Sequence, residues 1–475
     1  MASNQGRTDA GQPEGGRSGL VLLATGAAAV GGLLFGFDSA AINGAVDAIG
    51  ETYFLSSGAL GFTVAIALLG SAVGAWFAGR LADLWGRRAM MLISGVVFAA
   101  NSVGSALAGS DVELLIWRFV GGLAIGTASV IAPAYIGEIA PSKWRGALGS
   151  VQQLAITLGI FAALLSDALL AGDGGALATR WLGLEAWRWM LLVGVVPAAV
   201  YGVLSLFIPE SPYFLVRKNR NAQAAKVLSS VSGVQDTDAK IAEIKQSFAE
   251  SSNSYRSLRG PALGLQPILW IGMGVAALQQ LVGINVIFYY STTLWESVGF
   301  SASDSFTTSV ITAVINVVTT LVAIAFIDRV GRRRLLMIGS TGMTIGLLAT
   351  ALAFFQSTGS GGNVSLPGPW GAVALTGANL FVIFYGASWG PVMWVTLGEM
   401  FPNSIRSMGL SIGAMVNWIF NFAITLAFPW VNTNLGPAAA YSAFTGFAFI
   451  SFWFVKFKLP EFSGKSIDDS RLTRQ

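Results

Sequence analysis

Residues 83–88 read DLWGRR, and residues 328–333, in the second half of the chain, read DRVGRR. A second pair of strings follows, GEIAPSKWR over 137–145 and GEMFPNSIR over 398–406, with the same spacing from glutamate to arginine. Each string is flanked by long apolar segments. The chain is therefore predicted to contain the same six-helix membrane unit twice. This arrangement is typical of transporters, whose two halves can rock about a site between them.

The composition points to a membrane protein. Of the 475 residues, 54% are hydrophobic and only 11% are charged. Apolar stretches of about 20 residues, each long enough to cross the hydrocarbon core of a bilayer, follow one another along the chain. They predict an all-α integral membrane protein with twelve spans, near 20–43, 58–78, 89–109, 112–135, 147–170, 187–208, 266–291, 305–327, 334–356, 370–396, 407–430 and 437–457.

The lysines and arginines are unevenly placed. If both termini are cytoplasmic, all but three of the 28 lie in cytoplasmic segments, the exceptions being Arg118, Arg180 and Arg188. The positive-inside rule then predicts this orientation, and the net charge of +4 reflects topology rather than nucleic-acid binding. The predicted organisation is a disordered tail (1–17), an N-terminal six-helix bundle (18–208), an intracellular helical linker (209–262), a C-terminal six-helix bundle (263–459) and a cytoplasmic tail (460–475).

Two residue types are absent from the sequence, and their absence limits the kinds of site and of proton transfer that the protein can have. There is no cysteine and no histidine, so a disulfide framework and a thiolate metal site are excluded and any proton-linked step needs a carboxylate. No phosphate-binding cradle of the kind used by ATP-driven proteins occurs. The sequence predicts neither an enzyme nor a metal or cofactor site. The lack of cysteines and the short outer loops favour a bacterial inner (plasma) membrane.

Seven strings together resemble the sugar porter family of the major facilitator superfamily, from about Gly32 to Lys465. They lie at 79–88, 118–126, 133–146, 209–212, 279–290, 390–399 and 417–418. The resemblance is closest to bacterial proton-coupled glucose and hexose symporters. It implies the major facilitator fold, with two six-helix bundles and a monomeric protein whose partners are a monosaccharide, protons and the lipid bilayer.

Amide side chains in the middle of the predicted spans indicate a polar cavity. Intramembrane polar groups need partners, and amides both donate and accept hydrogen bonds, which suits the hydroxyls of a sugar. Tryptophans offer flat apolar faces to a sugar ring. The resemblance places these residues at sugar-contacting positions: Gln153, Gln279, Gln280, Asn285, Asn316, Trp389, Trp394 and Asn417. The alternative is hydrogen bonding between helices, which we favour for Gln152. The resemblance also favours a hexose, because glucose carriers of the family are apolar at the positions of Ile160 and Phe288, whereas the xylose-type bacterial member carries a glutamine at the position of Ile160.

Asp38 is the only carboxylate within the first apolar segment, and Arg118 opens the fourth. An ionisable residue at membrane depth is a functional candidate, with its partner to be named. Bacterial proton–sugar symporters of this family carry an aspartate at the position of Asp38. We therefore expect Asp38 and Arg118 to couple proton and sugar movement. A static ion pair is the alternative.

The repeated strings place acids beside arginines at the cytoplasmic ends of helices. Charge-assisted hydrogen bonds between helices of the two halves can close the inner mouth in one conformation and break in the other. The candidates for this gating are Asp83, Arg87, Glu138, Arg145, Asp328, Arg332, Glu399 and Arg406. The alternative is that the charges only set the topology.

Taken together, the residues predict a secondary active transporter that imports a monosaccharide, D-glucose or a related hexose, by proton symport through alternating access. Two alternatives stay open. One is a facilitative uniporter of the same fold, and the other is a sugar sensor that does not transport.

Overall fold

The computed structural model of the protein describes residues 18–139, 145–251, 258–297, 299–358, 365–401 and 405–460. Within these ranges the chain is helical, and extended backbone pairs only in three isolated bridges. Twelve segments of the described residues are long and apolar enough to cross a membrane. The all-α, twelve-span fold expected from the sequence is confirmed.

The first half of the chain supplies six of these segments. Its helices are α1 (Ser18–Ala41), η1 (Asn43–Ala45), α2 (Val46–Thr52), α3 (Ser57–Trp85), α4 (Arg87–Leu107), α5 (Asp111–Ile139), α6 (Arg145–Ala171), η3 (Gly172–Gly174), η4 (Trp181–Gly183), α7 (Ala186–Leu192) and α8 (Val195–Phe207). Three short amphipathic helices follow, α9 (Pro212–Arg217), α10 (Asn221–Ser230) and α11 (Thr237–Ser251).

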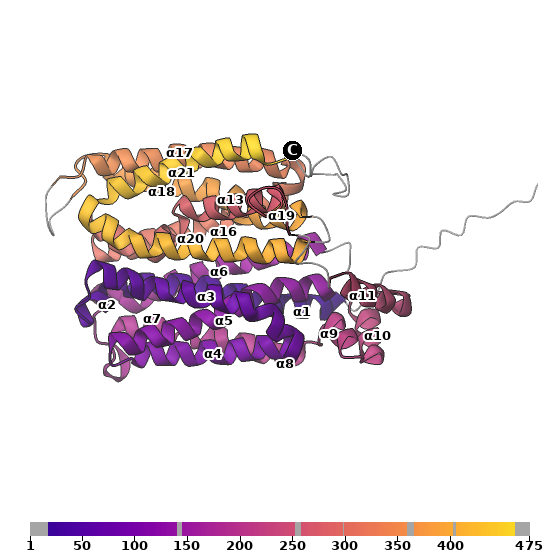
Figure 1. Ribbon diagram of the computed structural model, residues 1–475. Coiled ribbons are helices and arrows are strands. Elements are labelled where there is room, and N and C mark those ends of the chain that lie inside the picture. Colours follow the sequence, from indigo (N-terminus) through magenta and orange to yellow (C-terminus); the bar gives the residue numbers. More distant parts are fainter. Residues whose placement is uncertain are drawn as a thin grey trace, which may run out of the picture.

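The second half supplies the other six. Its helices are α13 (Pro267–Leu281), α14 (Ile284–Tyr289), α15 (Ser291–Ser297), α16 (Ala302–Val330), α17 (Arg332–Phe355), α18 (Trp370–Phe384), η5 (Tyr385–Trp389), α19 (Gly390–Met400), α20 (Arg406–Leu435) and α21 (Pro437–Lys458). Helices α1–α8 form one layer of the molecule and α13–α21 the other, while α9–α11 lie at one end (Figure 1). We call that end the linker end and the opposite one the far end.

The strings that occur twice in the sequence fold into the same turn. Gly86 ends α3 with φ +96° and ψ +162°, and Gly331 ends α16 with φ +88° and ψ +147°. This conformation is favourable only for glycine. In both halves the next residue, an arginine, begins a new helix. The turn therefore places equivalent arginines at the linker end of both halves.

Small residues let the helices within each half approach closely. In α5, a β-carbon added to Gly122 or Gly126 would collide with the backbone carbonyls of Ala67 and Ser71 in α3. Such glycine-lined contacts are the usual means of packing membrane helices, since lipid supplies no hydrophobic drive. The two halves meet where α3 packs along α20 and α6 along α16.

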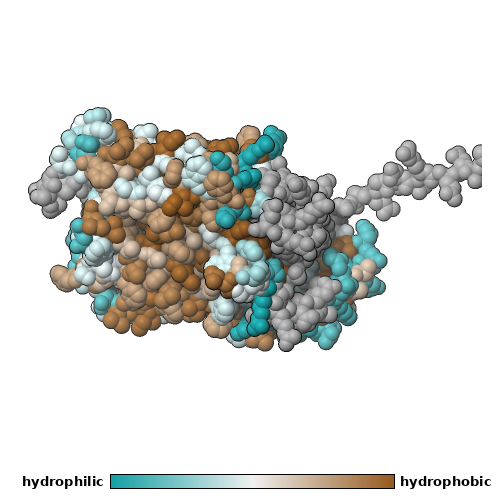
Figure 2. Space-filling model, turned by 45° about the horizontal axis from the view of Figure 1, so that its top comes forward, coloured by the Kyte–Doolittle hydropathy of each residue, from teal (hydrophilic) through white to brown (hydrophobic). Residues whose placement is uncertain are grey.

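The outer surface of the bundles is apolar. Large side chains such as Trp76, Val96, Phe326 and Phe449 are about half exposed. Figure 2 shows brown apolar surface across the middle of the bundles, with teal polar residues toward the ends and over α9–α11. A surface of this kind is stable against lipid and would aggregate in water.

Candidate functional site

Four amides of the second half form one network at the junction of α13, α14 and α20. Asn417 donates to the Gln279 Oε1 atom at 2.7 Å, and Gln280 donates to the Asn417 Oδ1 atom at 3.0 Å. Asn285 donates to the Gln280 Oε1 atom. Each amide thus uses another one as its partner, which is how polar groups are kept at membrane depth. Four residues expected at a sugar site are therefore together.

Gln279 ties this network to the broken tenth span. Its Nε2 atom donates to the carbonyl oxygen of Trp389 at 3.0 Å. That carbonyl belongs to η5, a π-helical turn. Asn316 of α16 faces the same turn, because a β-carbon added to Gly386 would lie 3.1 Å from its Oδ1 atom. The η5 turn therefore adjoins amides from two other helices.

The first half contributes Gln153 from α6. A β-carbon on Gly390 would lie 3.8 Å from the Gln153 Nε2 atom, so this amide faces the second half across the molecular centre. Its neighbour Gln152 instead packs against Gly32 of α1. This is the arrangement expected from neighbouring helical residues that point in different directions.

The two tryptophans of the expected site are placed differently. Trp394 on α19 keeps 37% of its surface exposed, so its ring remains accessible. Trp389 is fully buried, and its indole N–H donates to the Leu336 carbonyl at 3.1 Å and the Ser340 hydroxyl at 3.0 Å, both on α17. In this conformation Trp389 reaches the amide network through its backbone, whereas a ring contact had been expected.

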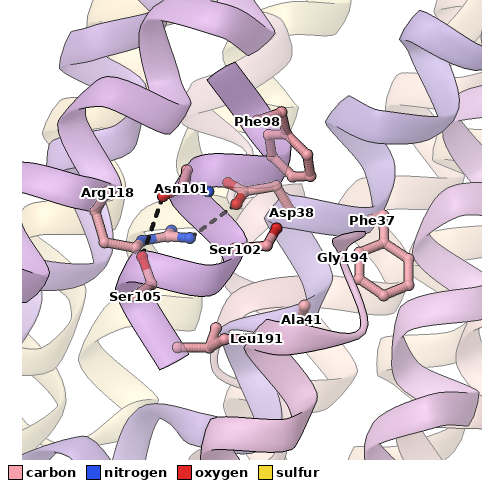
Figure 3. A pocket seen from close by; sticks show the side chains of 10 residues that line it. All are labelled: Phe37, Asp38, Ala41, Phe98, Asn101, Ser102, Ser105, Arg118, Leu191 and Gly194. Atoms are coloured by element: carbon pink, nitrogen blue, oxygen red, sulfur yellow. Dashed lines mark hydrogen bonds and ion pairs between the residues drawn. The ribbon is translucent and has the colours of Figure 1, made fainter. Parts of the chain in front are cut away.

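Asp38 and Arg118 meet as expected. The Arg118 Nη1 atom donates to the Asp38 Oδ1 atom at 3.0 Å, and both side chains are at least 90% buried. A cavity of about 10 Å³, enough for about one water molecule, adjoins the pair (Figure 3). It is lined by Phe37, Asp38, Ala41, Phe98, Asn101, Ser102, Ser105, Arg118, Leu191 and Gly194. The first half therefore encloses a buried ion pair with room for about one water molecule beside it.

At the linker end of the first half, Arg87 joins the two repeated strings. Its Nη2 atom lies 2.9 Å from a Glu138 oxygen and its Nη1 atom 3.2 Å from an Asp83 oxygen. Glu210, which the site prediction omitted, accepts from the backbone N–H of Arg87 at 2.9 Å. The doubled Pro-Glu string, present at 209–210 and 460–461, could have identified Glu210.

The second half repeats this contact. Arg332 and Glu399 form two parallel hydrogen bonds, at 3.0 and 2.9 Å, the strong fork geometry of an arginine–carboxylate pair. The pairs formed by Arg87 and by Arg332 each join helices of one half. The other three gating candidates, the side chains of Arg145, Asp328 and Arg406, lie outside the described part of the structure.

A set of contacts that the sequence did not indicate joins the two halves at the far end. Asn43 of η1 donates to the Ser291 hydroxyl at 2.7 Å, and its Oδ1 atom accepts from the Thr292 hydroxyl at 2.8 Å and backbone N–H at 3.1 Å. Beside it, Thr293 donates to Asp47 at 2.9 Å. We call Asn43, Ser291 and Thr292 the far-end latch. The latch holds the far ends of the halves together in this conformation.

The fold and the site define a class of protein: a membrane carrier of two similar halves, with a polar cluster between them. The family model described as "Sugar (and other) transporter" matches residues 24–471. The chain belongs to this family of transporters.

Similar proteins cover almost the whole chain. A glucose transport protein from Synechocystis is 48% identical over 94% of this chain and 96% of its own. A D-xylose-proton symporter from Escherichia coli is 32% identical over 93% of each. The xylose transporter XylE from the same species, solved in a partially occluded inward-open conformation, matches with a TM-score of 0.81 and 31% identity over 94% of this chain and 100% of that one.

Proposed function

We propose that the protein imports a monosaccharide, D-glucose or a related hexose, together with a proton, by alternating access. The observation that carries this proposal is the presence of two features in one molecule. An amide network lies in the second half and faces Gln153 of the first half, and a buried ion pair, Asp38–Arg118, lies within the first half. The amide network suits the binding of a sugar, and the buried ion pair suits the binding of a proton. The names of the similar proteins, a glucose transport protein and a D-xylose-proton symporter, support both parts.

In the proposed site, the amides exchange their mutual hydrogen bonds for bonds to sugar hydroxyls. Gln280, Gln279, Asn285 and Asn417 form one wall, and Gln153 faces them from the first half. Trp394 supplies an accessible ring, while Asn316 and the Trp389 backbone support the wall through η5. Ile160 and Phe288 are buried and apolar, as in the glucose carriers that the chain resembles, and this supports a hexose.

Asp38 is the proposed proton carrier. In the described conformation its Oδ1 atom accepts a hydrogen bond from Arg118, and in the proposed cycle this is the ionised state of Asp38. Protonation would remove its charge and release Arg118, and a buried arginine without its counter-ion is costly. The two protonation states therefore favour different arrangements of α1 and α5. That difference would link proton binding to the movement of the halves.

The conformation and orientation fit import. The far-end latch is closed, and the similarity to an inward-open structure supports an inward-facing state. We place the linker end and both termini in the cytoplasm of a bacterium, by the positive-inside rule, and take the protein to be monomeric in the bilayer. The acids and arginines of the repeated strings, Asp328, Arg145 and Arg406 included, would regroup across the halves when the inner mouth closes.

The test uses purified protein in liposomes. Radiolabelled glucose should accumulate above its outside concentration when the interior is made alkaline, and unlabelled hexoses should compete better than pentoses. Sugar flux that ignores the pH gradient would make the protein a uniporter. Binding without flux would make it a sensor.

A further inference from the structure

Asp167 is a buried carboxyl group that the proposed mechanism does not use. It lies on α6, one turn from the far end of that helix, and none of its surface is exposed. Its Oδ2 atom accepts a hydrogen bond from the backbone N–H of Gly44 at 3.3 Å. Its Oδ1 atom has no hydrogen-bond partner among the described residues. The side chain is therefore only half satisfied.

Among the described residues, no lysine or arginine side chain forms a hydrogen bond or ion pair with Asp167. Charged side chains do lie on the helices packed against α6 and on the loop that follows it, but the contacts that the structure gives them are with other residues. These contacts are Asp38 with Arg118, Arg188 with Glu185, Glu138 with Arg87, Glu399 with Arg332, Asp304 with Ser301, and Arg180 with the carbonyls of Leu170 and Ala171. An isolated carboxylate out of contact with water is far costlier than a neutral carboxyl with one unmade hydrogen bond. In this conformation Asp167 is therefore the neutral acid, whereas Asp38 has a cation beside it.

The position of Asp167 connects it to the far-end latch. Gly44 follows Asn43 in η1, and a β-carbon on Gly44 would lie only 2.9 Å from the Asp167 Oδ2 atom. The carboxyl group therefore contacts the turn from which Asn43 bonds to Ser291 and Thr292. A change in the contact between Asp167 and Gly44 would therefore alter the turn that carries Asn43, and with it the far-end latch.

We propose that Asp167 is a second proton-binding site, which senses the pH of the outer solution and stabilises the closed far-end latch when it is protonated. The proposal rests on the alternating access proposed above. One proton from the outer solution binds the carboxylate as the latch closes, and the same proton returns outside when the latch opens and water reaches the carboxyl group. Asp167 therefore gates the carrier without adding to the protons that cross the membrane.

The test measures the far-end conformation directly, and the lack of native cysteine makes the labelling simple. Gly58 on α3 and Ser303 on α16 are exposed at the far end of opposite halves. Nitroxides on Gly58→Cys and Ser303→Cys report the distance between the halves by electron spin resonance. With otherwise unchanged protein in liposomes, the ratio of closed to open far ends should fall as the pH rises, at most about tenfold per pH unit for one proton.

Asp167→Asn keeps the size of the side chain and the acceptor for Gly44 but cannot ionise. Its closed-to-open ratio should equal the acid-pH value of the parent at every pH, while pH-driven accumulation of sugar persists. Asp167→Ser, a smaller neutral side chain, should also lose the pH response, and it serves if the asparagine variant fails to fold.

The controls are Glu113→Gln, which changes an exposed carboxylate at the same end, and Asp38→Asn. The inference is wrong if the parent ratio does not respond to pH, or if Asp167→Asn still responds as the parent does. It is equally wrong if Asp38→Asn alone removes the response. Loss of pH-driven accumulation in the parent would instead contradict the proposed function, and the distance measurement would still decide the role of Asp167.

Discussion

Gln280 links the amides of the proposed sugar site. It donates to Asn417 and accepts from Asn285, and 7% of its surface is exposed. The sequence predicted that Gln280 lies among other polar groups, because an amide in an apolar helix needs hydrogen-bond partners. Trp389 shows the limit of such reasoning: the sequence places its Cα on the right turn, but the η5 winding directs its ring to α17.

Gln280→Ala should weaken sugar binding by about tenfold, or ~1.4 kcal/mol, because one or two hydrogen bonds to hydroxyls are lost. Equilibrium binding to purified protein measures the effect. Gln152→Ala is the matched control, since that amide packs against Gly32 of α1 and should leave affinity unchanged. Equal affinity in the two variants would remove Gln280 from the site.

Asp38→Asn should abolish accumulation driven by a pH gradient and keep sugar binding. The amide cannot titrate, and the amide network lies on other helices. Accumulation in liposomes and binding in detergent separate the two properties. Asp304→Asn, which changes an exposed carboxylate at the far end, should retain both. Uphill transport by Asp38→Asn would mean that another group carries the proton.

At the scale of single elements, the paired helices α3 and α5 depend on the absence of side chains at their contact. Hydropathy predicts both spans because it measures burial and length. It cannot show that Gly126 lies against the Ser71 carbonyl, since that contact depends on how the helices are rotated and where they cross. The break at Gly283, with φ +83° between α13 and α14, was likewise hidden within one predicted span.

Gly126→Ala should destabilise the protein by about 1–3 kcal/mol, because the added methyl group forces α3 and α5 apart. Thermal unfolding in detergent is a suitable measurement. Gly79→Ala on α3 is the control: nothing lies within 4 Å of the added carbon, and alanine favours the helix. A melting temperature for Gly126→Ala equal to that of the control would show that the contact does not limit stability.

At the scale of the whole molecule, the doubled strings predicted two similar halves, and the two halves do repeat one ion pair, Arg87–Glu138 and Arg332–Glu399. The contacts between halves were harder to predict. Asn43 and Ser291 are 248 residues apart and no local pattern links them. A lone asparagine at the end of an apolar stretch has many possible partners, and only the fold selects one.

The junction of the halves also carries a pH dependence. Glu296 on α15 lies near α2 of the other half, where burial and then the carboxylates of Asp47 and Glu51 raise its pKa from 4.5 to about 7. Between these two pH values the folded protein binds more protons than the unfolded chain. The free energy of unfolding must therefore fall as the pH rises through this window.

Unfolding measured from pH 4.5 to 7.5 should show this loss of stability, and Glu296→Gln should make the dependence shallower. Asp236→Asn, which changes an exposed carboxylate in the linker region, is the matched control and should leave the slope unchanged. A Glu296→Gln slope as steep as that of the unchanged protein would place the titrating group elsewhere.

The tenth span contains the π-helical turn η5, and no other helix in the described part of the chain contains such a turn. Pro391 follows it, and the wider turn moves the carbonyl that its ring would otherwise strike. Such a turn holds one residue more than α-helical winding requires. Moving that surplus residue past a segment rotates the segment by about 100° and shifts it by about 1.5 Å. If that surplus residue moved into α19, Trp394 would turn by about this angle relative to α18 while α18 kept its place.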